Sequence, residues 1–278
     1  MANYTAADIK ALRERTGAGM MDVKKALDEA NGDAEKAIEI IRIKGLKGAT
    51  KREGRSTAEG LVAAKVSNGV GVMIEVNCET DFVAKADKFI QLADKVLAVA
   101  VESGAADLDT LLAIDVDGKP LSEVVVEEGA ILGEKVVVRK LSRIVGGTVD
   151  AYLHKTSKDL PAQVGVLFAV DGEGEAAATA AHDIAVHIAA MSPNYLTRED
   201  VPSDLVESER RIAEETAKAE GKPEAAMTKI VEGRVTGFYK GEVLVDQAFA
   251  KDAKKSVAQV LEEAGVKGTS FARFRVGS

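Results

Sequence analysis

The chain is poor in the residues that most often carry chemistry or covalent cross-links. Among its 278 residues there are one cysteine, three histidines and no tryptophan. The single cysteine, Cys78, excludes an internal disulfide framework, which suits a reducing compartment. A lone cysteine is more often a small buried hydrophobic residue than a nucleophile. Aromatic residues make up 4% of the chain and hydrophobic residues 46%, so the cores must consist mainly of valine, isoleucine, leucine and alanine.

Long apolar segments and an excess of positive charge are also missing. No run of about 18 apolar residues occurs, and the N-terminus lacks the apolar stretch of a signal peptide, which predicts a cytoplasmic protein without a membrane span. The 37 Lys and Arg residues face 45 Asp and Glu residues. The net charge of −8 argues against a protein that coats nucleic acid or an anionic membrane. The length predicts two to four structural units.

Residues 1–45 predict three short helices. Thr5 is a good N-cap for the first helix, which should end at Gly17, and Asp33 caps the third, which should end at Gly45. The apolar residues at helical spacing are Ile9, Leu12, Met20, Val23, Leu27, Ala37, Ile38 and Ile41. A helical domain of this size needs tight packing to fold alone.

A basic stretch with several glycines follows in residues 46–59 and is predicted to be a linker. Residues 42–56, which include the end of the preceding helix, contain a single acid, Glu53, and the cations Arg42, Lys44, Lys47, Lys51, Arg52 and Arg55. Two interpretations stay open: a solvated linker, which is the commoner case, and a segment that contacts RNA.

After the linker the apolar pattern changes to the alternation typical of strands. Residues 60–146 predict a hairpin with its turn at Asn68-Gly69, a long helix over about residues 81–101, and a closing helix and strand. Residues 147–194 and 239–278 repeat the order strand, strand, helix, helix, strand, and "VGVMIEV" in the first copy corresponds to "VGVLFAV" in the second. The pattern predicts an α+β fold with a duplicated core of antiparallel sheet and helices.

The second copy is interrupted by an insertion, residues 195–238. Two charged helical stretches joined by Gly221-Lys222-Pro223 predict an antiparallel helical hairpin. We expect its apolar stripes to consist of Leu205, Ile212 and Ala219 in the first helix and Met227, Ile230, Val231, Val235 and Phe238 in the second. A projecting hairpin of this kind usually forms an interface, either with the core or with another chain.

A search for catalytic or ligand-binding motifs finds none. Neither the phosphate loop GxxxxGK[ST] nor the dinucleotide fingerprint occurs. His182 and His187 are five residues apart, which separates them by about 140° on a helix and does not suit a zinc site. We interpret them as structural or surface residues, and His154, at the end of a predicted strand, as a candidate contact residue. The sequence therefore predicts no cofactor and no metal site, and an enzyme without a recognisable constellation of catalytic residues is unsupported.

Two apolar features are not explained by the packing of their own segments. Met20 and Met21 are neighbours, and adjacent residues on a helix point about 100° apart, so we do not expect both to be buried in a small bundle. Phe82 follows Thr80, a good N-cap, and Asp81, whose carboxylate suits the start of a helix. Spacing alone favours burial of Phe82 beneath the sheet, and the alternative is an exposed interface anchor.

Several segments of the chain form a specific combination of motifs: "LRERTGAGMMD", "KKALDEANGD", "EVNCETDFVAK", "VGVL", "HIAAM", "GKP" followed by "MTKIVEGR", and "FRVG". Over essentially its whole length the chain resembles the elongation factor Ts family of bacteria. The resemblance implies a guanine nucleotide exchange factor for elongation factor Tu in translation. It also implies an N-terminal three-helix domain like the ubiquitin-associated (UBA) domain, a two-part core, and a helical hairpin through which the chain can form a homodimer.

The resemblance also implies which residues contact the partner. The segment that approaches the nucleotide-binding domain of elongation factor Tu would be Thr80, Asp81, Phe82 and Val83. The Phe82 ring would push between two helices there and disturb the magnesium site.

Further contacts implied by the resemblance fall elsewhere in the chain. Those of the N-terminal domain would involve Arg13, Met20 and Met21, and His154 matches a family loop that reads differently around it. The sequence ends at "FRVGS", so the contacts of an additional C-terminal helical module found in some members are not expected. Two other classes remain: a translation protein that binds RNA through the basic linker, and an enzyme of unknown chemistry. The net charge and the missing site residues weigh against both.

Overall fold

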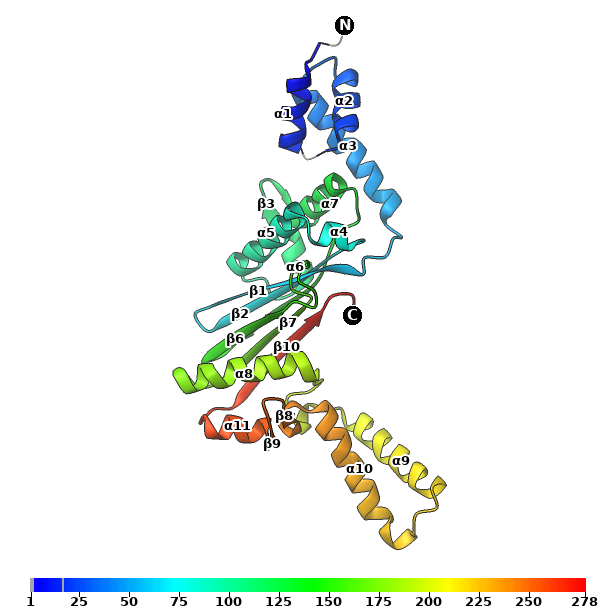
Figure 1. Ribbon diagram of the computed structural model, residues 1–278, viewed down its shortest axis with the longest axis vertical. Coiled ribbons are helices and arrows are strands. Elements are labelled where there is room, and N and C mark those ends of the chain that lie inside the picture. Colours follow the sequence, from blue (N-terminus) through cyan, green and yellow to red (C-terminus); the bar gives the residue numbers. More distant parts are fainter. Residues whose placement is uncertain (1–2, 17) are drawn as a thin grey trace.

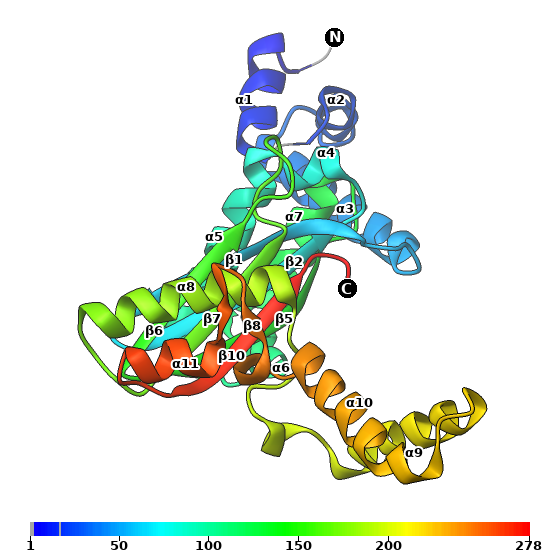
Figure 2. The same cartoon turned by 60° about the horizontal axis from the view of Figure 1, so that its bottom comes forward.

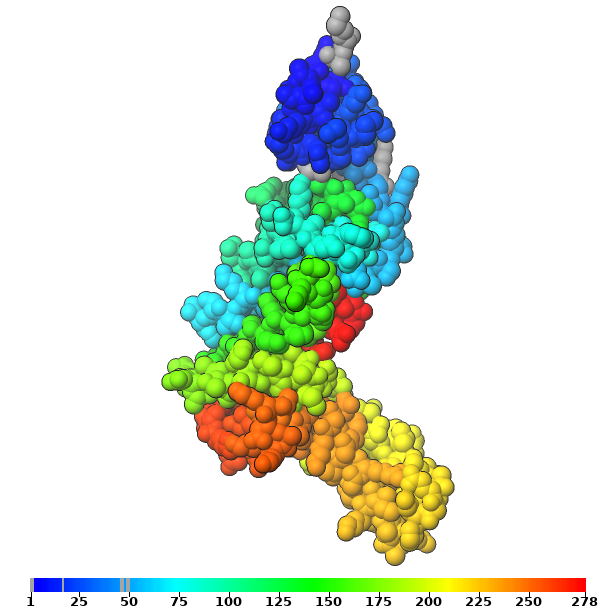
Figure 3. Space-filling view, in the orientation of Figure 1, coloured from blue at the N-terminus to red at the C-terminus, as the bar shows by residue number. Residues whose placement is uncertain are grey.

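The computed structural model describes residues 3–16 and 18–278, without the side chains of residues 46, 47, 49 and 50. The molecule is elongated (Figure 1): three N-terminal helices lie at one end, two three-stranded sheets with their helices form the middle, and a pair of helices projects at the other end. The space-filling view shows these parts in a row, with the helix pair standing away from the body (Figure 3). Helices combined with antiparallel sheets confirm the predicted α+β class.

The N-terminal unit consists of α1 (Ala6–Thr16), α2 (Met20–Glu29) and α3 (Ala34–Arg52). Both predicted caps are present: Thr5 and Asp8 exchange hydrogen bonds at the start of α1, and the Asp33 carboxylate accepts two backbone N–H groups at the start of α3. The core of the unit contains Leu12, Ala18, Val23, Ala26, Leu27, Ala30 and Ala37. The predicted helix end at Gly17 and the side chain of Lys47 lie outside the described residues.

The prediction that the third helix ends at Gly45 is wrong. The helix continues to Arg52, so half of the predicted linker is helical. α3 packs against α7 (Leu121–Leu132). Gly45 permits this contact, because a Cβ at that position would lie only 2.9 Å from the Ala130 Cβ. Packing between helices therefore outweighs the low helix propensity of glycine.

The first sheet is antiparallel, in the order β1-β2-β5, and consists of β1 (Glu59–Ser67), β2 (Val70–Cys78) and β5 (Val137–Val145). Asn68 and Gly69 connect the first two strands with positive φ angles of 51° and 72°, which confirms the predicted hairpin turn. The helices of this half are α4 (Asp81–Ala84), α5 (Asp87–Ser103), α6 (Leu108–Ala113) and α7, with the short strands β3 (Asp115–Val116) and β4 (Lys119–Pro120) between the last two.

The single helix predicted over residues 81–101 is in fact two helices, α4 and α5. Ala86 separates them with an extended backbone, at φ −73° and ψ 135°. The break leaves α4 at the end of β2, where Ala84 is fully buried, while α5 lies on the sheet. The face of α5 that lies on the sheet contains Phe89, Leu92 and Val96, which are buried, and Val99, which is partly buried.

The second sheet is also antiparallel, in the order β10-β7-β6, and consists of β6 (Thr148–His154), β7 (Val164–Val170) and β10 (Gly268–Arg275). In both sheets the second strand is central and the last strand lies at an edge. Figure 2 shows α8 (Glu175–Met191) lying across this sheet, with α11 (Val257–Glu263) beside it. The other short elements are η1 (Arg198–Asp200), η2 (Glu224–Ala226), η3 (Leu244–Asp246), β8 (Ala248–Phe249) and β9 (Asp252–Ser256).

The two sheets pack face to face, and a glycine in each central strand sets their close approach. A Cβ at Gly71 of β2 would lie 2.8 Å from the Val149 Cγ1, and one at Gly165 of β7 would lie 2.4 Å from the Val62 Cγ1. The buried layer between the sheets contains Val62, Met73, Ile144, Val149, Leu167 and Ala169. The shared "VG" of "VGVMIEV" and "VGVLFAV" thus has one physical cause in both halves: no larger residue fits between the sheets.

The projecting pair consists of α9 (Ser203–Ala219) and α10 (Met227–Glu242). The predicted stripe on α9 is wrong: Ile212 is 51% exposed, and the seam is formed by Ala213 and Ala217 against Val231 and Val235 of α10. The small alanine side chains let the two helices approach closely. A search for apolar residues at heptad spacing does not find this seam. Ion pairs such as Arg210–Glu232 and Arg234–Glu220 link the helices across the seam.

Candidate functional site

The candidate site is the corner at which β2 ends and α4 begins. Thr80 has an extended backbone (φ −127°, ψ 155°), and its Oγ1 accepts the N–H of Val83 at 3.4 Å, which confirms Thr80 as the N-cap. Asp81 is then the first helical residue, where its carboxylate suits the positive end of the helix dipole.

The two inner residues of α4 hold it to the body while its aromatic residue points away. Ala84 is fully buried and Val83 packs against the core of the first half. Phe82 is 73% exposed, so the prediction from spacing that it is buried beneath the sheet is wrong. Lys85 lies beside the ring, with Nζ 4.7 Å from the ring centroid and 3.5 Å from the Asp81 carboxylate. The corner therefore presents one ring flanked by one ion pair.

Two glutamates fasten this corner to the segment that follows α7. The Glu134 carboxylate accepts the N–H of Glu79 at 2.9 Å and that of Thr80 at 3.0 Å, as well as the Thr80 hydroxyl at 2.5 Å. The Glu79 carboxylate in turn accepts the N–H of Lys135 at 2.7 Å and pairs with Arg55. Partial burial acts to raise the pKa of Glu79, but the hydrogen bonds from Lys135 and Arg55 outweigh it and lower that pKa.

Cys78, the last residue of β2, supports the corner from inside. It is fully buried, and its thiol donates to the carbonyl of Thr80 at 3.3 Å. Burial, together with the nearby Glu134 charge, raises the pKa of the thiol to about 12. The prediction that Cys78 is a small buried residue is confirmed.

Met20 and Met21 are on the N-terminal unit, at the start of α2, and Arg13 is on α1. The two methionines are 58% and 61% exposed, and Arg13 is exposed as well. The buried face of α2 consists of Val23, Ala26 and Leu27 and does not include either methionine. These three residues lie on a different unit of the chain from Phe82.

His154 ends β6 on the second sheet and is exposed. Its Nδ1 lies 3.1 Å from the hydroxyl of Tyr152, whose ring is also edge-on to that of His182. His182 pairs with Asp150 at 3.2 Å. The structure therefore places His154 in a polar cluster on the second half, apart from the corner that holds Phe82.

His187 has a purely structural environment. It is 1% exposed, its Nε2 lies 2.8 Å from the Gln247 side-chain oxygen, and its Nδ1 accepts the N–H of Ala250 at 3.1 Å. These two partners require a neutral ring with the proton on Nε2. Burial lowers the pKa of His187, in agreement with that state.

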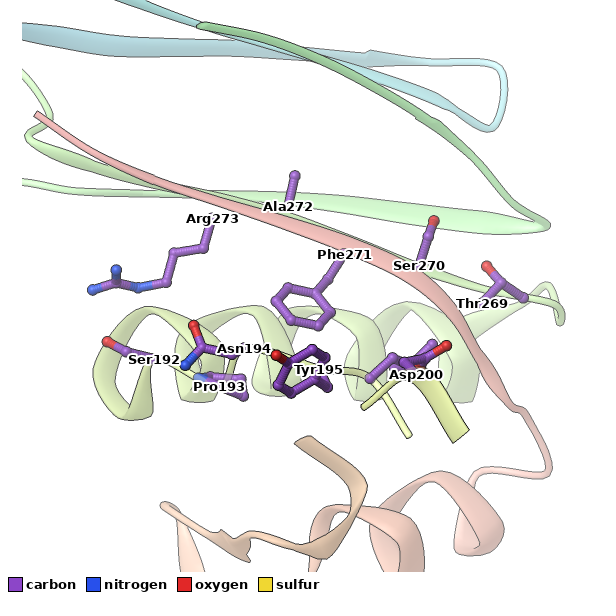
Figure 4. Close-up of a pocket in the computed structure, with 11 residues that line it drawn as sticks. Ser192, Pro193, Asn194, Tyr195, Asp200, Thr269, Ser270, Phe271, Ala272 and Arg273 are labelled. Atoms are coloured by element: carbon purple, nitrogen blue, oxygen red, sulfur yellow. The ribbon is translucent and has the colours of Figure 1, made fainter. Parts of the chain in front are cut away.

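The sequence did not predict a hollow of about 520 Å³ between β10 and the segment that follows α8. Figure 4 shows Phe271 and Tyr195 pointing toward one another across it, with Arg273 at one end. Arg273 donates from one terminal nitrogen to the carbonyl of Ala189, while its buried Nε has no hydrogen-bond partner, and Asp200 caps η1. The hollow is thus a surface of aromatic and polar side chains.

The described residues, 3–16 and 18–278, contain no cluster of three or more His, Cys, Asp or Glu side chains placed to bind a metal ion. Across the same residues, no helix combines the length and the apolar character needed to cross a membrane.

Comparison with known proteins gives a consistent result. Residues 79–278 match the family model described as "Elongation factor TS". The chain is 95% identical to elongation factor Ts of Pseudarthrobacter chlorophenolicus and of an Arthrobacter species (strain FB24), and 56% identical to that of Kineococcus radiotolerans. Each of these alignments covers the full length of both chains. The chain therefore belongs to the elongation factor Ts family.

Proposed function

We propose that this chain is a guanine nucleotide exchange factor, which binds elongation factor Tu in its GDP form and promotes the release of GDP during translation elongation. The observation that carries the proposal is Phe82, a 73% exposed aromatic ring on a one-turn helix whose start is fastened from two sides. Aromatic anchors of this kind dominate the binding energy of protein interfaces. Membership of the elongation factor Ts family supports the choice of partner.

In the proposed mechanism the Phe82 ring enters the nucleotide-binding domain of the partner between two helices and disturbs the site of Mg²⁺ and phosphate. An exchange factor must bind the nucleotide-free partner more tightly than the nucleotide-bound one, and by reciprocity nucleotide displaces the factor. A thousandfold faster release corresponds to about 4 kcal/mol at the transition state. Full burial of one phenylalanine supplies about 1.5–3 kcal/mol, so neighbouring contacts must provide the remainder. No covalent step is required, and the chain acts as a binding protein, not as an enzyme.

The neighbours of the ring have separate tasks in this mechanism. Val83 stays packed on the core, so the backbone of α4 does not yield when the ring is pushed into the partner. Asp81 places a carboxylate beside the ring, held by Lys85 at 3.5 Å. When the ring is buried in the partner, Lys85 must leave its face. Binding therefore loses a cation–π attraction of about 0.5–1 kcal/mol that is present in the free chain.

Secondary contacts with elongation factor Tu are proposed at two other places. On the N-terminal unit, which we propose to be UBA-like, Arg13, Met20 and Met21 would contact the partner, and the flexible methionine side chains suit an adaptable surface. On the second half, His154 would make a weaker contact. Spreading contacts over the length of an elongated molecule lets the factor hold the partner while GDP leaves.

We propose an interface role for α9 and α10 as well. Their seam is narrow, and Ile212 remains 51% exposed on the outside of α9. A second copy of the chain and a surface of the partner are the two occupants that suit this pair. Light scattering on the chain alone, and then on its mixture with elongation factor Tu, distinguishes them through the mass of each complex.

The experiment that tests the function measures the release of a fluorescent GDP analogue from elongation factor Tu by stopped flow. Phe82→Ala should slow stimulated release by about 10- to 100-fold, since a central aromatic anchor contributes about 2 kcal/mol or more. Val145→Ala is the matched control, because Val145 is a similarly exposed apolar side chain, at 63%, at the end of β5. Release by Phe82→Ala at the rate of the unmodified chain would refute the proposed role of the ring.

A further inference from the structure

The backbone that leads into α4 depends on one side chain from a distant part of the sequence. β2 ends at Cys78, so the N–H groups of Glu79 and Thr80 have no partner in the sheet. Both donate to one oxygen of the Glu134 carboxylate, while the other oxygen accepts the Thr80 hydroxyl. Hydrogen bonds to an ionised carboxylate are roughly twice as strong as neutral ones.

The hydroxyl bond also determines how well Thr80 caps α4. Because the proton of Thr80 Oγ1 is directed to Glu134, a lone pair of that oxygen is free to face the N–H of Val83. A one-turn helix of four residues cannot hold itself together by its own hydrogen bonds. The direction of Phe82 is therefore decided by the start of α4, and Glu134 holds that start.

Glu134 is itself fixed in place. It follows Gly133, which ends α7 in the left-handed conformation at φ 82°, and its N–H donates to the carbonyl of Gly129 at 3.1 Å. The next residue, Lys135, donates its N–H to the Glu79 carboxylate. Each segment thus supplies a carboxylate to the backbone of the other, and we call Glu79 with Glu134 the reciprocal pair.

We propose that Glu134 is a positioning residue for nucleotide exchange, which acts by holding the start of α4 so that Phe82 is presented in one direction before the partner arrives. This inference rests on the proposed role of Phe82 as the anchor. A side chain whose backbone is already ordered loses less conformational freedom on binding. That difference appears as faster GDP release or as tighter binding to the partner.

A double-mutant cycle tests the inference in the full-length chain. Glu134→Ala should slow stimulated GDP release about tenfold, the order expected when a helix start loses its cap. In the Phe82→Ala background the same substitution should have no further effect, because the ring that it positions is absent. Glu134→Gln, which keeps the shape and one acceptor oxygen, should give a smaller loss with the same dependence on Phe82. Glu128→Ala removes the same charge from α7 and serves as the control.

Amide hydrogen exchange provides a readout that does not depend on activity. The N–H groups of Glu79 and Thr80 should exchange faster in Glu134→Ala and in Glu134→Gln, while the N–H groups of β2 stay protected. Unchanged protection at Glu79 and Thr80 would overturn the inference, as would an equal loss of activity in both backgrounds, which indicates a general loss of folding. If Phe82→Ala alone leaves exchange of GDP unaffected, the proposed function fails, and the amide protection still decides whether Glu134 orders the corner.

Discussion

Truncation of the two phenylalanines at either side of the α4–α5 break should change the stability of the chain by very different amounts. Phe82 and Phe89 are seven residues apart, yet the first is 73% exposed and the second is fully buried in the core of the first half. We expect Phe89→Ala to destabilise the chain strongly and Phe82→Ala to leave its stability nearly unchanged. The comparison separates a residue that holds the fold from one that is available to a partner.

The expected magnitudes follow from burial. Replacing a fully buried phenylalanine by alanine costs about 3–5 kcal/mol, the range for Phe89. About a quarter of Phe82 is covered, and full burial of such a side chain is worth about 1.5–3 kcal/mol, so truncation loses about 0.4–0.8 kcal/mol. Loss of the Lys85 contact adds about 0.5 kcal/mol, which the better helix propensity of alanine offsets. The net effect of Phe82→Ala should be below about 1 kcal/mol.

Guanidinium unfolding, followed by circular dichroism and by amide hydrogen exchange within the first sheet, measures both values in the intact chain. The expected difference between the two variants is at least about 2 kcal/mol. A loss above about 2.5 kcal/mol for Phe82→Ala would refute the reasoning, because a ring that contributes so much must be covered in the free protein.

Two further predictions concern buried titratable groups. Burial lowers the pKa of His187, so below about pH 6.5 the unfolded chain takes up a proton that the folded chain does not. The contribution of His187 to the free energy of unfolding is therefore fully present above that pH. It is lost as the pH drops, by at most about 1.4 kcal/mol per pH unit. Urea unfolding between about pH 7 and pH 5 should show a flatter profile for His187→Gln than for the unmodified chain or for the exposed control His182→Gln, and equal slopes would contradict the assignment. The thiol of Cys78, fully buried and with its pKa raised to about 12, should react with a thiol reagent at least about a hundredfold more slowly in the folded chain than in urea; immediate stoichiometric labelling of the folded chain would rule this out.

The features that the sequence predicted correctly depend on neighbouring residues. Thr80 and Asp33 cap helices through N–H groups two or three residues ahead, and Asn68-Gly69 turns a hairpin through its own backbone angles. Such signals lie within a few positions of one another and can be read from a single sequence. That Met20 and Met21 are not both buried also agrees with local geometry, since neighbouring residues on a helix point about 100° apart.

The features that the sequence did not predict depend on contacts between distant segments. Glu134 fastens Thr80 from 54 positions away, and nothing around Glu134 marks it as more than a glutamate after a helix end. Gly45 is a normal helix-ending signal until α7 packs against it. On α9, the alanines of the seam carry less apolar signal than Ile212, which faces outward. In each case the neighbouring residues are compatible with more than one structure, and contacts with a distant segment determine which one forms.

The break at Ala86 is the feature that turns Phe82 from a core position into a contact position. Residues seven apart on one continuous helix differ by two turns and lie on nearly the same face, so an unbroken helix would direct Phe82 inward with Phe89. This is why spacing alone favoured burial of Phe82. The extended backbone of Ala86 uncouples the two helices, and the reciprocal pair of Glu79 and Glu134 then fixes the direction of α4 independently of α5. Exposure of the ring is therefore built into the backbone and is present before any partner binds.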